Sequence, residues 1–218
     1  MSTFPGSPQL LKGGIVLLNP DTGQPVQIIV LQYNPDTLTR TLQVQGIGPE
    51  PGDRLEALRL KSPPLETIKL DAEIDATDQM EKADQTTAQL GIYPQLAALE
   101  TIVYPSSQQL QANDSQSQMG TLEIAPMEAP LALFVWSQVR VLPVRITDFS
   151  ITEEAFDPRL NPIQAKVDLG MRVLTYMELK EDTIGFGAYI AYQAQKEVLA
   201  RMVRPGESAG AIRGLIPL

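Results

Sequence analysis

Hydrophobic and polar residues alternate in two stretches of the chain, and each alternation predicts a β-strand. Within residues 66–75, apolar side chains fall at positions 68 to 74 in steps of two, and charged ones fall between them. Residues 163–174 repeat this pattern with the apolar set Ile163, Ala165, Val167, Leu169, Met171 and Val173. Since successive side chains of a strand point to opposite faces, both segments should have one buried face and one wet face.

Shorter apolar stretches predict further strands. Residues 15–18, 26–33 and 38–44 are separated by turn-forming Asn, Asp, Gly and Pro, which indicates a hairpin followed by a third strand. In the second half, residues 131–136 and 139–151 read as strands, the latter with a break at Pro143. Residues 46–64 are rich in Gly and Pro and should form an irregular connection with room for a helical turn at 54–60.

Helical spacing is found in two places. Residues 92–104 contain Leu96, Leu99, Ile102 and Val103 with Pro94 in the first turn, which predicts one short amphipathic helix. Thr183 should cap a C-terminal helix reaching about Val203. The apolar stripe expected on this helix is Ile184, Ala188, Ala191, Val198 and Met202, with Tyr192 and Leu199 beside it.

These elements together predict a mainly β, α+β fold, a barrel or sandwich with helices packed outside. Residues 1–13 are expected to be an N-terminal arm, residues 14–176 the β-domain, and residues 177–218 a C-terminal helix and tail. The Ser, Gln and Asn tract at 106–120 lies in a region, 105–129, expected to be a flexible loop. The tail from Gly206 to Leu218 is either disordered or docks on a neighbour.

Composition removes several kinds of chemistry. The chain has no cysteine and no histidine, which excludes thiol nucleophiles, disulfides, Ser-His-Asp triads and the usual zinc sites. Its net charge of −9 argues against binding to the phosphate backbone of a nucleic acid. Residues 1–14 lack a secretory signal, and no apolar run is long enough to span a bilayer. We therefore expect a cytoplasmic protein without direct membrane insertion.

Two groups of acidic residues are candidate sites. Asp71, Glu73 and Asp75 share the polar face of a strand, where they either ligate Ca²⁺ or Mg²⁺ or are simply solvated; the absence of a Gly-centred calcium loop favours solvation. Glycosidases use a pair of carboxylates, and Glu153 and Glu154 are such a pair in the sequence. Neighbours on a strand point to opposite faces, however, and cannot share a site.

Two other motifs have ordinary structural interpretations. The segment 185–187, Gly-Phe-Gly, lacks the third glycine and the Lys-Ser/Thr of a phosphate loop, which favours a helix start. Phe134, Trp136 and Phe149 would form a stacking surface only in a basic setting, so core packing is favoured and Trp136 is expected to be buried. No catalytic, cofactor-binding or metal-binding residue is therefore predicted, and no cofactor; the chain is not expected to be an enzyme.

Three segments resemble the N-terminal domain of the contractile injection system tube protein family. They are residues 31–40 (LQYNPDTLTR), residues 65–78 (LETIKLDAEIDATD) followed by 91–103 (GIYPQLAALETIV), and residues 133–136 (LFVW) with 156–167 (FDPRLNPIQAKV). Together they cover about residues 26–176. The chain departs from the family after Tyr176, where a LysM module commonly follows, so peptidoglycan binding is not implied.

The resemblance implies a structural subunit of a phage-tail-like particle, an adaptor in the baseplate that joins the spike or hub to the inner tube. Its implied partners are further copies in a ring, with six-fold symmetry, the inner tube protein, the spike or hub protein and other baseplate subunits. A β-barrel module that binds a small molecule or a glycan is the alternative. In either case residues 156–161 should form a turn between two paired strands, because Asp157-Pro158 and Asn161-Pro162 are turn initiators.

Overall fold

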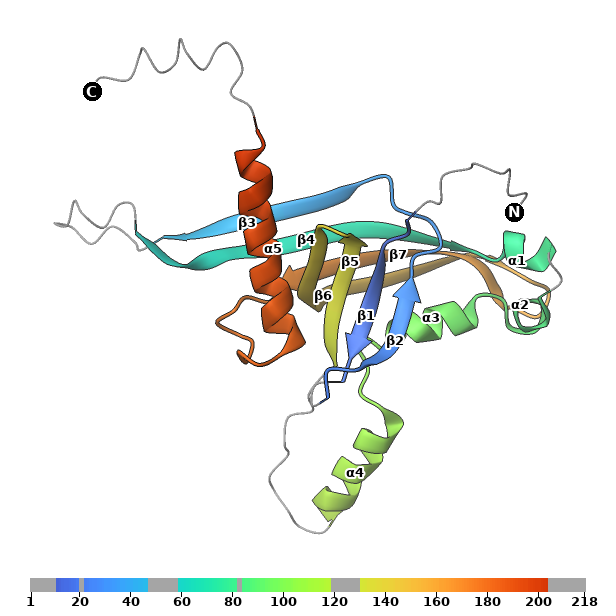
Figure 1. Cartoon of the computed structure of the whole chain (residues 1–218). Helices are drawn as coiled ribbons and strands as arrows, with labels where there is room; N and C mark the ends of the chain where they lie inside the picture. The colour runs from blue at the N-terminus through green and yellow to red at the C-terminus, as the bar shows by residue number, and fades with distance from the viewer. Residues whose placement is uncertain (1–10, 20–21, 47–58, 82–83, 119–129, 204–218) are drawn as a thin grey trace, which may run out of the picture.

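Seven strands and five helices make up the described part of the chain, which in this computed structural model is residues 11–19, 22–46, 59–81, 84–118 and 130–203 (Figure 1). The strands are β1 (Gly14–Leu18), β2 (Pro25–Val30), β3 (Leu38–Gly46), β4 (Leu60–Asp75), β5 (Leu131–Ser137), β6 (Arg140–Phe156) and β7 (Pro162–Val173). The helices are α1 (Thr77–Glu81), α2 (Gln85–Leu90), α3 (Tyr93–Glu100), α4 (Ser107–Gln118) and α5 (Ile184–Arg201). The predicted mainly β, α+β class is confirmed.

All seven strands belong to one antiparallel sheet with the order β2-β1-β5-β6-β7-β4-β3. The long strand β6 joins its two halves, since residues 140–144 pair with β5 and residues 144–156 pair with β7. In Figure 1 the group β1, β2 and β5 crosses the direction of the long strands β3, β4 and β7. The sheet therefore bends over itself at β6, where a register shift between Ile146 and Asp148 marks a bulge.

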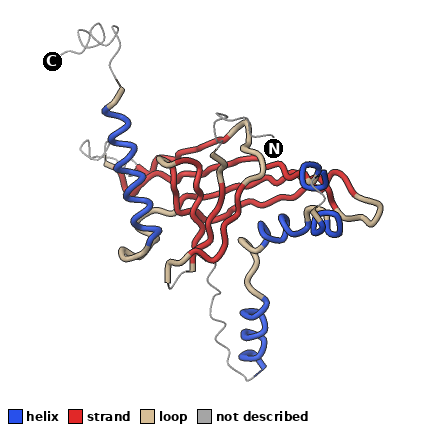
Figure 2. Tube along the Cα trace, turned by 45° about the vertical axis from the view of Figure 1, so that its right-hand side comes forward, coloured by secondary structure: helices blue, strands red, loops and turns tan. Residues whose placement is uncertain are grey.

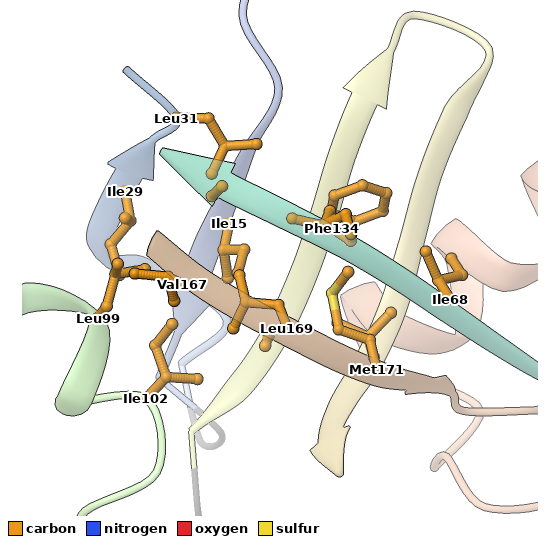
Figure 3. Close-up of a cluster of buried hydrophobic side chains, with 14 of the residues drawn as sticks. Ile15, Ile29, Leu31, Ile68, Leu99, Ile102, Phe134, Val167, Leu169 and Met171 are labelled. Atoms are coloured by element: carbon orange, nitrogen blue, oxygen red, sulfur yellow. The ribbon is translucent and has the colours of Figure 1, made fainter. Parts of the chain in front are cut away.

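The hydrophobic core fills the inside of this bend. Side chains from both groups of strands meet there, as Figure 3 shows for Ile15 and Phe134 on one side and Ile68, Leu169 and Met171 on the other. Four of these five side chains are at most 1% exposed, and the fifth, Leu169, is 2% exposed. The alternation in residues 66–75 and 163–174 places the side chains of β4 and β7 in the core, because only one face of each strand is apolar.

Helices close the core at two ends (Figure 2). The segment around α3 contributes Ile92, Leu96, Leu99 and Ile102, and the backbone N–H of Ile92 donates to the carbonyl of Pro162 over 2.8 Å. At the other end α5 begins at the predicted cap, where the Thr183 hydroxyl accepts from the Phe186 N–H. The predicted helix at 92–104 is thus present as α3, preceded by the short helices α1 and α2.

Residues 107–118 are helical, so the predicted flexible loop is wrong over this range. Ser106 and Gln109 form a capping box: the Gln109 N–H donates to the Ser106 hydroxyl over 3.2 Å, and the Ser106 N–H donates to Gln109 Oε1 over 3.1 Å. Gln and Ala then tolerate the helical backbone. The low apolar content, from which a loop was expected, instead leaves α4 standing away from the sheet (Figure 2).

Prolines interrupt the strands less than expected. Pro143 lies inside β6, which continues through it. The β6–β7 ladder ends at the pair Val144–Val173, one residue before Pro143 is reached. The N–H that proline lacks is therefore at a position where β7 has already ended. Pro63 and Pro64 lie inside β4, not in the predicted connection, at a register shift against β3. The rest of that connection, residues 47–58, lies outside the described residues.

The turn at residues 156–161 is confirmed, because Phe156 pairs with Pro162 and residues 157–161 connect β6 to β7.

Trp136 is only half-buried, which corrects the expectation of full burial: its ring stacks on Phe134 at 5.9 Å between centroids and covers Gly13 at the rim of the core. The first ten residues of the N-terminal arm and the tail from residue 204 fall outside the described ranges. Within those ranges, none of the helices is both long and apolar enough to cross a membrane.

The packed face of α5 is not the predicted stripe. Gly185, Tyr189 and Tyr192 are buried, whereas Ile184, Val198, Leu199 and Met202 are exposed. Gly185 admits the close approach, since a Cβ there would lie 2.8 Å from Leu131 Cδ2. The aromatic side chains give the sheet more contact area than the aliphatic ones would.

Phe134→Ala should lower the free energy of unfolding by about 3 to 5 kcal/mol, because it removes a fully buried aromatic side chain from the middle of the core. Urea denaturation followed by circular dichroism measures the change. Val44→Ala is the control, since Val44 is 70% exposed and should change stability by less than about 0.5 kcal/mol. Equal losses in the two variants would contradict this placement of the core.

Candidate functional site

The outward face of β4, β7 and β6 is a continuous surface of polar side chains. We call it the polar face; its exposed members are Lys69, Asp71, Glu73, Ser150, Thr152, Glu154, Lys166 and Asp168. They occupy the strand positions between those that fill the core. The same alternation that builds the core therefore builds a wide, flat polar surface on the other side of the sheet.

Positive and negative groups are interleaved on the polar face. Lys166 Nζ lies 2.6 Å from Glu154 Oε1, and Gln164 Nε2 donates to Glu73 Oε1 over 3.0 Å. The hydrogen bond and charge of Glu154, helped by the charge of Glu73, raise the pKa of Lys166. Because these groups are open to solvent, the pairs hold side chains in place more than they stabilise the fold.

The three acidic residues considered for metal binding have different surroundings. Asp71 is directly opposite Asp168 across the β4–β7 ladder, and Glu73 is opposite Lys166. Asp75, at the end of β4, accepts a hydrogen bond from the Thr77 N–H over 2.7 Å. In the part of the chain that the structure describes, no group of three or more His, Cys, Asp or Glu residues could hold a metal ion.

The remaining candidates also have structural roles. Glu154 is on the polar face with Lys166, whereas Glu153 is opposite Ala165, a core residue of β7, so the two carboxylates point apart as expected. The Gly-Phe-Gly segment forms the first turn of α5. Phe134 is fully buried, so its ring is not available to stack on a nucleic acid base.

A buried ion pair that lies beside the middle of α5 was not predicted from the sequence. Glu66 Oε1 accepts hydrogen bonds from Arg40 Nε at 2.8 Å and Nη2 at 2.6 Å, and Arg40 Nη2 also donates to the Tyr192 hydroxyl over 3.0 Å. The Glu66 side chain is 6% exposed. A signal was present in the sequence: Glu66 and Arg40 share the strand phase of the apolar residues Ile68 and Leu38, where a charge requires a partner.

This cluster fixes α5 against β3 and β4. Burial, aided by the charge of Glu66, raises the pKa of the Tyr192 hydroxyl. Lys196 Nζ lies 4.4 Å from the centroid of the Tyr192 ring, and burial lowers its pKa. Arg40 of β3 thus joins Glu66 of β4 to Tyr192 of α5 by charge-assisted hydrogen bonds, while the cation–π contact lies within α5.

Both edge strands of the sheet expose apolar side chains. On β2, Val26, Ile28 and Val30 are 65%, 64% and 57% exposed. On β3, Leu42 is 48% exposed and Val44 is 70% exposed. Proteins usually protect edge strands with charges, prolines or a covering element, so unprotected edges of this kind are sites of strand pairing.

The segments that carry the family resemblance make connections in the fold. Asn34, from residues 31–40, accepts from the Gly13 N–H at 2.9 Å and donates to the Leu11 carbonyl at 2.9 Å. Asp157 accepts from the Asn161 N–H at 2.9 Å, and Asn161 donates to the Gln89 carbonyl at 3.0 Å. The hydrogen bond from the Asn161 side-chain amide to Asp157, followed by the one from the Asn161 backbone N–H, lowers the pKa of the Asp157 carboxyl.

Comparison with protein-family models and with curated proteins finds no match for this chain.

Arg40→Ala should destabilise the fold by about 3 kcal/mol, because it leaves the buried Glu66 carboxylate without its partner. The double variant Arg40→Met/Glu66→Met should recover most of that loss, since neither charge is then buried alone. Urea denaturation measures all three proteins. Lys166→Ala is the control, because it breaks an exposed pair and should cost less than about 1 kcal/mol. If Arg40→Ala and Lys166→Ala lower the free energy of unfolding by similar amounts, Glu66 is not desolvated.

Asp71→Asn should leave stability unchanged or raise it by up to about 1 kcal/mol, because it relieves two like charges that face each other across the ladder. Glu73→Gln makes the same change of charge two residues away but weakens contacts with Lys166 and Gln164, so it should be neutral or destabilising. The melting temperatures of the two variants give the comparison. A lower melting temperature for Asp71→Asn than for Glu73→Gln would contradict the pairing.

Proposed function

We propose that this protein is a structural subunit of a contractile injection system, an adaptor in the baseplate that joins the spike or hub to the inner tube. It acts as one member of a ring of copies with six-fold symmetry, assembled in the cytoplasm, and carries out no catalysis. The observation on which this proposal rests is that, in the described residues, both edge strands of the sheet, β2 and β3, expose apolar side chains, while the outward face of β4, β7 and β6 is polar.

Two complementary edges on one subunit suit assembly by a repeated contact. When a β2 edge meets a β3 edge of the next copy, the contact joins different surfaces, and repetition with a fixed rotation closes a ring. Ile28 and Val44 lose exposed area in such a contact, and the free backbone groups of both strands gain partners. A subunit that stays alone keeps both edges exposed to aggregation.

The polar face suits the wall of a channel. Its described members are polar and its opposite charges are neighbours, as with Glu154 beside Lys166 and Glu73 opposite Lys166. A surface of this kind gives a passing protein few places to adhere. Ring closure through the edges would set the polar faces of successive copies side by side around one axis.

The resemblance of residues 26–176 to the tube protein family supports the same function, since the residues that carry it hold the connections β2–β3 and β6–β7 in place. The alternative, a barrel that binds a small molecule or a glycan inside, finds less support. The interior between the two strand groups is filled by Phe134, Ile68 and Met171.

Assembly is tested by light scattering after size-exclusion chromatography and by negative-stain electron microscopy, with the protein alone and mixed with the spike and tube subunits. The wild type should form rings. Ile28→Lys should abolish the ring and lower the mass to no more than twice that of the single chain, 23.9 kDa, because it places a charge in the middle of the β2 edge. Leu160→Lys is the matched control, since Leu160 is 75% exposed at the β6–β7 turn, away from both edges.

A wild type that forms no ring alone or with those subunits would refute the proposal. So would a ring that Ile28→Lys and Leu160→Lys disturb equally, since the β2 edge would then have no special part. Retention of an oligosaccharide or a small molecule by the single chain would support the alternative function.

A further inference from the structure

The outward side of α5 carries a regular, mostly apolar stripe that is largely exposed; Ile184 Cδ1 at its start lies beside Gly23, and Ala188 and Gln195 are half-buried. We call it the outer seam; its members are Ile184, Ala188, Ala191, Gln195, Val198 and Met202. They follow one another at steps of four and three residues, the spacing of a helix that pairs with another helix. The large members are well exposed: Ile184 51%, Val198 45% and Met202 66%.

The outer seam is separate from the side of α5 that holds the helix on the sheet. Gly185, Tyr189 and Tyr192 form the packed side, and they lie about 100°, 140° and 80° around the helix from the middle of the seam. The C-terminal part of α5 also extends beyond the strands (Figure 1). A helix docked on one side in this way is already ordered, which lowers the entropic cost of a second contact.

We propose that the outer seam binds the outer seam of a second copy of this chain, with the two α5 helices antiparallel. Antiparallel packing centred near residue 193 sets Ile184 against Met202 of the second copy, Ala188 against Val198, and Ala191 against Gln195. Each layer but the first then places a small side chain against a larger one. Parallel packing would stack the alanines on each other and leave a gap between the helices.

Charge favours the same orientation. Glu181 and Asp182 are exposed just before α5, and Arg201 is in its last turn, where it lies 3.8 Å from Glu197. In an antiparallel pair the acidic end of each helix is beside the Arg201 end of the other. The seam itself carries no charged residue, so its burial leaves no ion without water.

This pairing does not rest on the function proposed above. It uses residues of α5, whereas the ring contact uses β2 and β3, so one molecule has surfaces for both. The contact is a two-fold one, in which the same surface of each copy meets itself. A pair of this kind joins two free subunits or two rings.

The first test compares Val198→Glu with Ala200→Glu by light scattering at a series of concentrations, in the Ile28→Lys background that removes the ring contact. That background protein should dimerise, with a mass near twice 23.9 kDa. Val198→Glu should raise the dissociation constant by about tenfold or more, because it buries a charge in the seam. Ala200→Glu adds the same charge on an exposed site on the other side of the helix and should leave the dimer intact.

The second test determines the relative orientation of the two helices by disulfide formation. Only the introduced cysteines can react, because the chain has no cysteine of its own. Ala188→Cys and Val198→Cys proteins are mixed and oxidised. Antiparallel pairing predicts mainly the mixed disulfide between them, since those positions share a layer. Parallel pairing predicts that each variant links to itself.

Three results would overturn the proposal: a background protein that stays monomeric at every concentration, a dimer weakened equally by Val198→Glu and Ala200→Glu, or self-linked products in place of the mixed disulfide. Circular dichroism of each variant excludes loss of the helix as the cause. Ring formation by Val198→Glu in the wild-type background reports separately on the proposed function.

Discussion

Alternation along the long antiparallel strands β4, β7 and β6 is the constraint on which the rest of the molecule depends. The ladder sets Leu70 against Leu169 and Asp71 against Asp168, so apolar and polar side chains fall in register across three strands. A slip of one residue in β7 would move Asp168 into the core. One face of the sheet must therefore be covered, and the other can remain in water.

The way in which the inner face is covered decides where the remaining surfaces lie. The bend at β6 folds β1, β2 and β5 over the long strands, and α3 and α5 close the two ends. Glu66, a charge at a core position, is neutralised by Arg40 and in this way ties β3 to Tyr192 of α5. A buried ion pair contributes little net stability compared with apolar packing, but it permits few alternative arrangements. We infer that it selects which side of α5 meets the sheet, and so which side remains exposed.

What the molecule leaves uncovered is consistent with a protein that works in an assembly. The edges β2 and β3 expose apolar side chains, and so does the outward side of α5. These surfaces belong to different elements of the fold, whereas the polar face offers charges to solvent. In our proposal the edges join copies into a ring and the polar face lines it, so that function follows from the placement of surfaces and not from a reactive group.

The sequence by itself determined most of the strands and the starts of α3 and α5, because these depend on local patterns. Alternation located β4 and β7, turn residues located the connection at 157–161, and Thr183 marked the first turn of α5. Each of these signals involves residues close together in the chain. The positions of the polar face residues followed directly from them.

Only the tertiary structure decided the features that depend on distant partners. The sequence of α5 offers two apolar stripes, and the sheet selects the one with Tyr189 and Tyr192 because Arg40 and Glu66 lie there. Pro143 remains within a strand because β7 ends beside it, and α4 is a helix although few of its residues are apolar. The pairing of Glu66 with Arg40 joins residues 26 positions apart, and no local pattern determines which charge will meet a buried one.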